Sequence, residues 1–228
     1  EIDLIVERAG GWAVGLRLLS ASTRLLDTFA GTSDRDTRQP IGSNVVDYLF
    51  SEVIGQQSAD VQDFLLRTAI LDFLRPEFCD ALTGRTDSRT LLDRLVADHL
   101  FTEIIDRAGR AYRYHPLFRD ALLSQQKQHL TPAEIASLHR AAALQYQASD
   151  TFEWAAHHHM LAGDWEVALE LVHGQASAWV LEDKLPSLET WTGRFPLDVL
   201  LRDTFLTFCR MWAFVRLGKV LAADHLLE

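Results

Sequence analysis

Apolar residues recur three and four positions apart along most of the chain, the spacing that places them on one face of an α-helix. This pattern predicts helices over residues 2–30, with a break at Gly10-Gly11, and further helices from Ser43, after Ser58 and from about Ser88. Residues 31–40 are polar and are expected to form an exposed loop or linker.

The period changes near residue 101. Residues 101–105 and 111–114 are rich in β-branched and aromatic side chains, and the turn between them contains Gly109. This arrangement predicts a two-stranded hairpin. Pro116 then suits the first turn of a helix that reaches about His129. Three helices, a hairpin and a helix make up a winged helix, which we assign to residues 41–130.

From Thr131 onward the pattern is helical throughout. Thr131-Pro132-Ala133-Glu134 has the form of a capping box with proline in the first turn. Residues 163–171 are echoed by residues 218–226: in both, a glycine turn precedes apolar, alanine and leucine positions. We therefore expect a mainly α fold, in which a winged helix with one β-hairpin is followed by a tetratricopeptide-like α-solenoid over 131–228. Its helices are expected over 132–148, 151–162, 165–173, 175–184, 187–194, 203–217 and from 219 onward.

Charge and motifs narrow the range of functions. The net charge is -10 and the sequence pI about 5.3, with no basic stripe to neutralise phosphates, so direct DNA contact is not expected. The chain has no G-x-x-x-x-G-K-[ST] phosphate loop and no local catalytic arrangement, so it is not expected to be an enzyme. No apolar run is long enough to span a membrane. Cys79 and Cys209 form no ligand pattern and are expected to be buried in a reducing cytoplasm.

Three segments in order carry a family resemblance. They are GWAVGLRL at residues 11–18, YHPLFRDAL at 114–122, and HRAA at 139–142 followed by AHHHMLAGD at 156–164. Together they resemble large LuxR-type regulators, signal-transduction ATPases of the maltose-regulon-activator-like group. The resemblance covers residues 1 to about 195.

The resemblance implies a connecting, regulatory segment in the middle of a transcription activator. Residues 1–40 would be the helical end of the nucleotide-binding region. ATP or ADP would bind in an upstream domain of the same polypeptide, with no cofactor in this chain, and a downstream domain would bind DNA. The resemblance also implies a small-molecule inducer or a protein as partner of the repeat domain, and self-association of the active form.

His115 is the first candidate for a functional contact. It precedes the helix predicted from Pro116, and the free N–H groups at a helix N-terminus favour phosphate. Related signal-transduction ATPases place a Met-His-Asp motif at this corner, whereas this chain has Tyr114-His115-Pro116, which keeps the histidine and lacks the acid. We expect His115 to contact nucleotide phosphate. The alternative is that it caps the helix or fills a gap beside Phe118.

Arg119 lies one helical turn after His115 and would share its face. It could contact the same phosphate. The commoner arrangement for such an arginine is an ion pair, here with Asp120 or with a neighbouring carboxylate.

The run His157–His159 suggests a metal site. However, consecutive helix positions point about 100° apart, and no histidine follows four positions on. We expect packed helix histidines and no metal. Several tryptophans follow in the repeat region; we expect them in the core, with a ligand groove as the alternative. They are Trp154, Trp165, Trp179, Trp191 and Trp212.

Two other functions remain open at this point. The chain could be a freestanding helical-repeat scaffold for another protein. A weaker alternative is a metal-dependent enzyme that uses the helix containing His157–His159.

Overall fold

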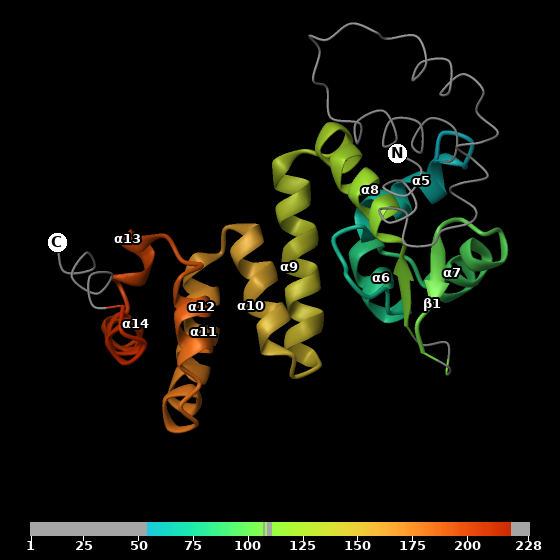
Figure 1. Cartoon of the computed structure of the whole chain (residues 1–228). Helices are drawn as coiled ribbons and strands as arrows, with labels where there is room; N and C mark the ends of the chain where they lie inside the picture. Colours follow the sequence, from blue (N-terminus) through green and yellow to red (C-terminus); the bar gives the residue numbers. More distant parts are fainter. Residues whose placement is uncertain (1–53, 107, 109–110, 220–228) are drawn as a thin grey trace, which may run out of the picture. The chain divides into compact units, whose positions relative to one another are not determined.

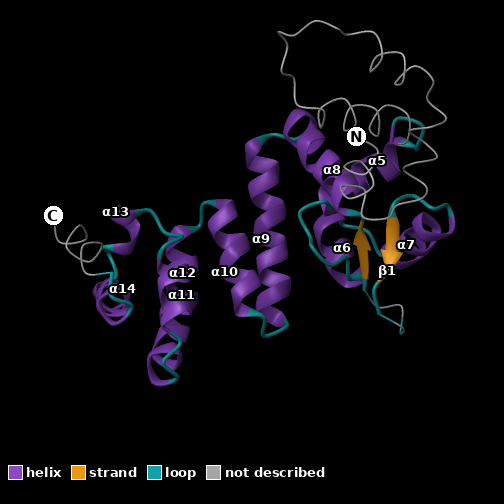
Figure 2. Ribbon diagram, in the orientation of Figure 1, coloured by secondary structure: helices purple, strands orange, loops and turns teal. Residues whose placement is uncertain are grey.

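The computed structural model describes residues 54–106, 108 and 111–219, all of which belong to the compact unit Asn44–Glu228 (Figure 1). The helices predicted over 2–30 and from Ser43, the linker over 31–40, Gly109 and the helix predicted from 219 onward lie outside these residues or run beyond them. What is described is mainly helical with one small sheet, as the sequence predicted (Figure 2). None of the described helices combines the length and the hydropathy needed to cross a bilayer.

The first part is a winged helix. Its elements are α5 (Ala59–Thr68), α6 (Pro76–Thr83), α7 (Ser88–Ala97), β1 (Thr102–Ile104), β2 (Tyr112–Tyr114) and α8 (Pro116–His129). The two strands pair antiparallel, with Thr102 opposite Tyr114 and Ile104 opposite Tyr112. Leu74 adds an isolated bridge to Tyr112, with N–O distances of 2.8 and 3.0 Å between the two backbones. The predicted hairpin is confirmed, and the segment before α6 extends it on one side.

Helix α6 was not predicted from the sequence. It is only eight residues long, so its apolar residues do not complete enough turns to give a clear period. The sequence signals that mark this helix lie at its two ends. Pro76 occupies the first turn, and Gly84 ends the helix with a left-handed φ of 71°, where glycine fits without strain. Phe78 and Cys79 are buried on its inner face.

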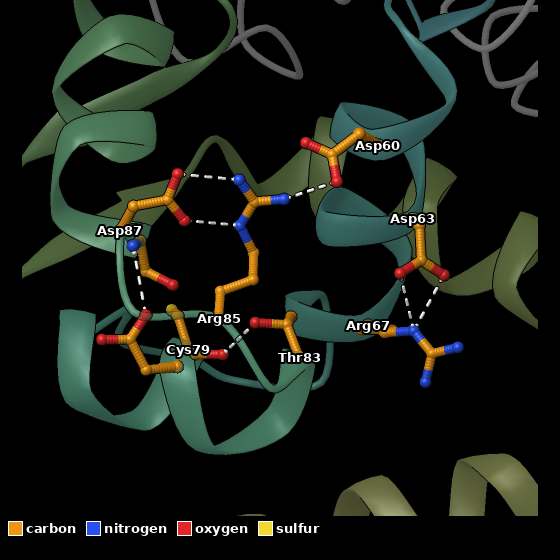
Figure 3. Close-up of polar contacts among 9 residues, drawn as sticks. Asp60, Asp63, Arg67, Cys79, Thr83, Arg85 and Asp87 are labelled. Carbon is orange, nitrogen blue, oxygen red and sulfur yellow. Dashed lines mark hydrogen bonds and ion pairs between the residues drawn. The ribbon is translucent and has the colours of Figure 1, made fainter.

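Polar contacts join α5, α6 and α7 of the winged helix (Figure 3). The Arg85 guanidinium donates to both carboxylate oxygens of Asp87 at 2.8 and 2.9 Å, and to Asp60 at 2.5 Å. The Asp87 side chain makes no capping hydrogen bond to α7, and Asp80 of α6 accepts from the backbone N–H of Ser88 at 3.1 Å, at the start of α7. These are exposed ion pairs, so they contribute geometry more than stability.

The second part is a run of paired helices. They are α9 (Pro132–Ala148), α10 (Phe152–Ala162), α11 (Trp165–Leu181), α12 (Leu185–Thr192), α13 (Leu197–Leu200) and α14 (Thr204–Arg216). The capping box at the start of α9 is confirmed. Thr131 Oγ1 accepts from the N–H of Glu134 at 3.2 Å, and the Glu134 carboxylate accepts from the N–H of Thr131 at 2.8 Å. The short α13 was not predicted.

Helix α11 corrects a prediction. The sequence indicated two helices separated at Gly174, whereas α11 runs without interruption from Trp165 to Leu181. Glycine inside a helix lowers its stability but does not remove a hydrogen bond, so it does not have to end the helix. The packing of α11 against α10 and α12 outweighs this local weakness.

The hydrophobic core does not stop where the winged helix ends. One cluster of buried side chains fills α5 to α8 and continues into α9 and α10 through Leu138, Ala142, Tyr146 and Ala155. A second cluster begins at Ala156 and extends to α14. Helices α9 and α10 lie side by side and form an extensive helix pair (Figure 1). The predicted boundary at 130/131 therefore separates two helices that share one core.

Candidate regulatory site at the winged-helix corner

His115 occupies the corner between β2 and α8. It is the N-cap residue of α8, with Pro116 in the first turn. Its backbone N–H donates to the carbonyl of Phe101 at 2.7 Å, and its own carbonyl accepts from the N–H of Arg119 at 2.9 Å. Phe101 adopts a left-handed φ of 48°, which is unusual for a bulky residue. The corner is thus fixed by backbone contacts on both sides of His115.

The imidazole of His115 is half-buried. Burial lowers the pKa of His115 below the usual value; the nearby Glu103 carboxylate acts in the opposite direction, and Arg113 lowers the pKa. The ring is therefore neutral at physiological pH. A neutral imidazole donates from one nitrogen and accepts at the other, so it could donate one hydrogen bond to an anion.

Arg119 points toward the end of α5. Its Nε donates to the carbonyl of Ala69 at 2.9 Å and Nη2 to that of Ile70 at 3.2 Å. Its Nη1 forms an ion pair with Asp72 at 2.8 Å. A guanidinium suits this place because the last carbonyls of a helix carry partial negative charge. Arg119 therefore ties α8 to the connection between α5 and α6, and Asp72 is the carboxylate it meets. Contact of His115 or Arg119 with phosphate stays a prediction.

The histidines of α10 point in different directions. His158 faces His139 of α9, with 2.9 Å between their Nδ1 atoms, and both rings are buried. Desolvation lowers the pKa of His139 to about 4 and that of His158 to about 3. His159 lies 3.6 Å from Asp164, and His157 is half-buried. Across residues 54–106 and 111–219, no three His, Cys, Asp or Glu side chains are arranged to hold a metal ion.

The two halves of the third sequence signature meet in space. His139 contacts His158, and Arg140, the next residue, binds Asp164 of the Ala-Gly-Asp turn. The Arg140 Nε and Nη2 atoms donate to the carboxylate at 2.7 Å each, and Nη2 also lies 3.4 Å from the carbonyl of Ala162. Asp164 precedes α11 directly. These residues therefore fix the turn from α10 to α11, a pairing that the spacing in the sequence did not predict.

The tryptophans of the repeat region are mostly packed against other rings. Phe152, Trp179 and Trp191 form a cluster from α10, α11 and α12, with centroids 5.7 to 6.4 Å apart. Arg194 stacks over Trp191 at 4.1 Å. Trp154 stacks on Tyr146, 5.8 Å between centroids, and therefore belongs to the junction with the winged helix.

Comparison with known proteins agrees with the assignment of a winged helix. Residues 50–134 match the family model described as the MalT winged helix domain, which takes in α5 to α8 and the wing. The chain therefore resembles a segment of MalT that includes its winged helix domain. It is similar to the HTH-type transcriptional regulator MalT of Klebsiella pneumoniae (strain 342), with 28% identity over 208 residues. That match covers 91% of this chain and 23% of the relative. The chain thus spans about a quarter of the length of the curated relative it matches.

Proposed function

We propose that this chain is a regulatory, connecting segment of a multidomain transcription regulator. In this role it relays the state of an upstream nucleotide-binding domain and of an inducer-binding repeat region to a downstream DNA-binding domain. The likeness to an HTH-type transcriptional regulator supports the class, and the fraction of that relative covered agrees with a segment. The proposal assigns no catalytic residue to the chain.

The observation that carries the proposal is the core shared by the winged helix and the first repeat helices. Tyr146 of α9 contacts Phe78 of α6 edge-on, with 5.0 Å between ring centroids. Trp154 of α10 contacts Phe73, which precedes α6, at 6.3 Å. Close-packed interiors transmit displacement because they do not deform continuously. A movement of the winged helix would therefore carry α9 and α10 with it.

We further propose that His115 contacts the nucleotide bound to the upstream domain. A neutral ring at the start of α8 would donate to a phosphate of bound ADP and hold the resting state. A hydrogen bond to a charged group contributes about 1.5–3 kcal/mol. If it exists only in the resting state, its loss shifts the equilibrium toward the active state roughly 10- to 150-fold.

The test uses the full-length regulator with His115→Ala. We expect faster ADP release and higher reporter output without inducer. His129→Ala, an exposed histidine at the far end of the same helix, is the matched control and should leave both unchanged. A lowered melting temperature beside unchanged ADP release would instead leave His115 as a packing residue.

Arg119 is tested by comparison with its ion-pair partner. If Arg119 only ties α8 to α5, Arg119→Ala and Asp72→Asn should both lower the melting temperature and leave ADP release unchanged. If Arg119 also contacts phosphate, only Arg119→Ala should accelerate ADP release. A freestanding scaffold would show no dependence on nucleotide in either variant.

A further inference from the structure

Aromatic and polar side chains of the winged helix and of α10 meet at the junction between them. Phe73, which precedes α6, contacts Trp154 of α10 with 6.3 Å between ring centroids, and is 41% exposed. His157 stands three positions after Trp154 and therefore shares its helical face. Both residues are half-buried, so this face of α10 is partly open to solvent.

The end of α12 adds a stacked arginine. Trp191 contacts Phe152 of α10, with 6.2 Å between ring centroids, and Arg194 stacks over Trp191 at 4.1 Å. Arg194 is exposed, and within the described part of the chain its guanidinium makes no hydrogen bond or ion pair. A guanidinium stacked on a ring keeps its N–H groups at its edge, where they match the geometry of a carboxylate or a phosphate.

The charges around His157 are mainly positive. Burial lowers the pKa of His157 most; Arg194 lowers it further, Asp72 raises it and Arg119 lowers it. Asp72 is already paired with Arg119 at 2.8 Å. Arg194 is therefore left without a carboxylate among the described residues, in a chain whose net charge is -10. A local excess of positive charge attracts an anion.

Two buried polar atoms beside these side chains have no hydrogen-bond partner among the described residues. They are the hydroxyl oxygen of Tyr146 and Nε2 of His158. The ring of Tyr146 stacks on Trp154 at 5.8 Å and on His158 at 5.2 Å, and the rings of His157 and His158 lie 5.7 Å apart. Buried polar groups are nearly always paired, so two such atoms in one group of rings indicate a place where a bound molecule completes the hydrogen bonding.

We propose that this part of the junction binds a small molecule that carries a carboxylate or a phosphate and a flat apolar part. The residues of this junction surface are Phe73, Trp154, His157, Trp191 and Arg194. The edge of the Arg194 guanidinium binds the anionic group, and the ring of His157 donates a further hydrogen bond. The flat part of the molecule packs on Trp154 and Phe73.

A molecule in this position contacts the winged helix and the repeat helices at once. Its binding would therefore act on the core that the two parts share. That consequence rests on the proposed function, in which the junction relays the state of one part to the other. The binding itself does not depend on the relay.

Calorimetric titration of the 228-residue protein with phenyl phosphate tests the site. We expect saturable binding, weaker binding of inorganic phosphate, which lacks the ring, and no binding of benzyl alcohol, which lacks the charge. Arg194→Gln should weaken the binding of phenyl phosphate by about fivefold or more, the contribution of one exposed ion pair. His157→Asn should also weaken it. Circular dichroism of each variant checks that the fold is intact.

Arg216→Gln is the matched control. Arg216 also lies over a tryptophan, 5.4 Å from the ring of Trp212, but it pairs with Asp183 and lies outside the junction surface. This substitution should leave binding unchanged. The absence of binding would overturn the proposal, as would equal weakening by Arg194→Gln and Arg216→Gln. Tighter binding of an acidic peptide than of phenyl phosphate would also overturn it and indicate a protein partner. None of these results bears on the proposed function, which is tested separately by ADP release from the full-length regulator.

Discussion

His139 and His158 face each other across α9 and α10 with their Nδ1 atoms 2.9 Å apart and both rings buried. In this hydrogen bond one Nδ1 atom must donate and the other must accept, and two neutral rings can meet that requirement. The ring of Tyr146 stacks on His158, with 5.2 Å between centroids. A neutral histidine pair is thus part of the packing between the first two repeat helices.

This pair should make stability depend on pH. Both pKa values lie below the ordinary 6.5, at about 4 and about 3, so the unfolded chain binds protons that the folded chain does not. Stability is full above pH 6.5 and falls as the pH decreases toward 4, by about 1.4 kcal/mol per unit for each histidine. His158→Asn, which can keep one hydrogen bond, should give a shallower slope in denaturant unfolding between pH 6.5 and 4. Parallel curves for variant and wild type would show that the pair does not titrate in this window.

Tyr146 should contribute through its ring and not through its hydroxyl. The ring contacts Phe78, Trp154 and His158, whereas the buried hydroxyl has no hydrogen-bond partner among the described residues. Tyr146→Phe should therefore leave the free energy of unfolding unchanged or raise it slightly. Tyr146→Ala should lower it by about 3–5 kcal/mol. Equilibrium unfolding of both variants measures this difference, and a large loss in the phenylalanine variant would indicate an unseen partner for the hydroxyl.

Substitution by alanine should have opposite effects on stability at two glycines, Gly174 and Gly163. A Cβ atom at Gly174 or at Gly163 would meet no other atom within 4 Å, so only the backbone distinguishes them. Gly174 lies inside α11, and Gly174→Ala should stabilise the protein by about 1 kcal/mol. Gly163 has a φ of 80°, and Gly163→Ala should destabilise it by about 1–2 kcal/mol. Shifts of the same sign in chemical denaturation would contradict this account.

The shared core predicts where the chain can be shortened. A fragment that ends at Leu130 would lose the side chains that α9 and α10 contribute to the winged-helix core. A fragment that ends at Gly163 would keep them. Starting from Asn44 in both cases, the longer fragment should melt cooperatively and at a clearly higher temperature, as measured by circular dichroism. Equal melting temperatures would mean that α9 and α10 add nothing to the winged helix.

Much of the fold could be predicted because local signals agree with it. The capping box at Thr131, the proline at position 116 and the period change near residue 101 each mark an element that the structure contains. Helix α6 was missed because eight residues give too little periodicity, and Gly174 was misread because glycine weakens a helix without ending it. The contacts of Arg119 with Ala69 and Ile70 span about fifty residues, and no local pattern encodes a partner at that distance. The position of His115 could be predicted because it depends on its neighbours in sequence.

Helix α10 is buried on two sides, with Ala155 in one hydrophobic cluster and its neighbour Ala156 in the other. Each residue turns an α-helix by about 100°, so the insertion or deletion of one residue before Ala155 would rotate the rest of the helix by about 100° and place different residues in the two clusters. Both clusters would then be disrupted at once, and the loops on either side are too short to absorb the rotation. The length of α10 is therefore under tighter constraint than its exposed residues are, and natural variation in chain length should fall elsewhere in this protein.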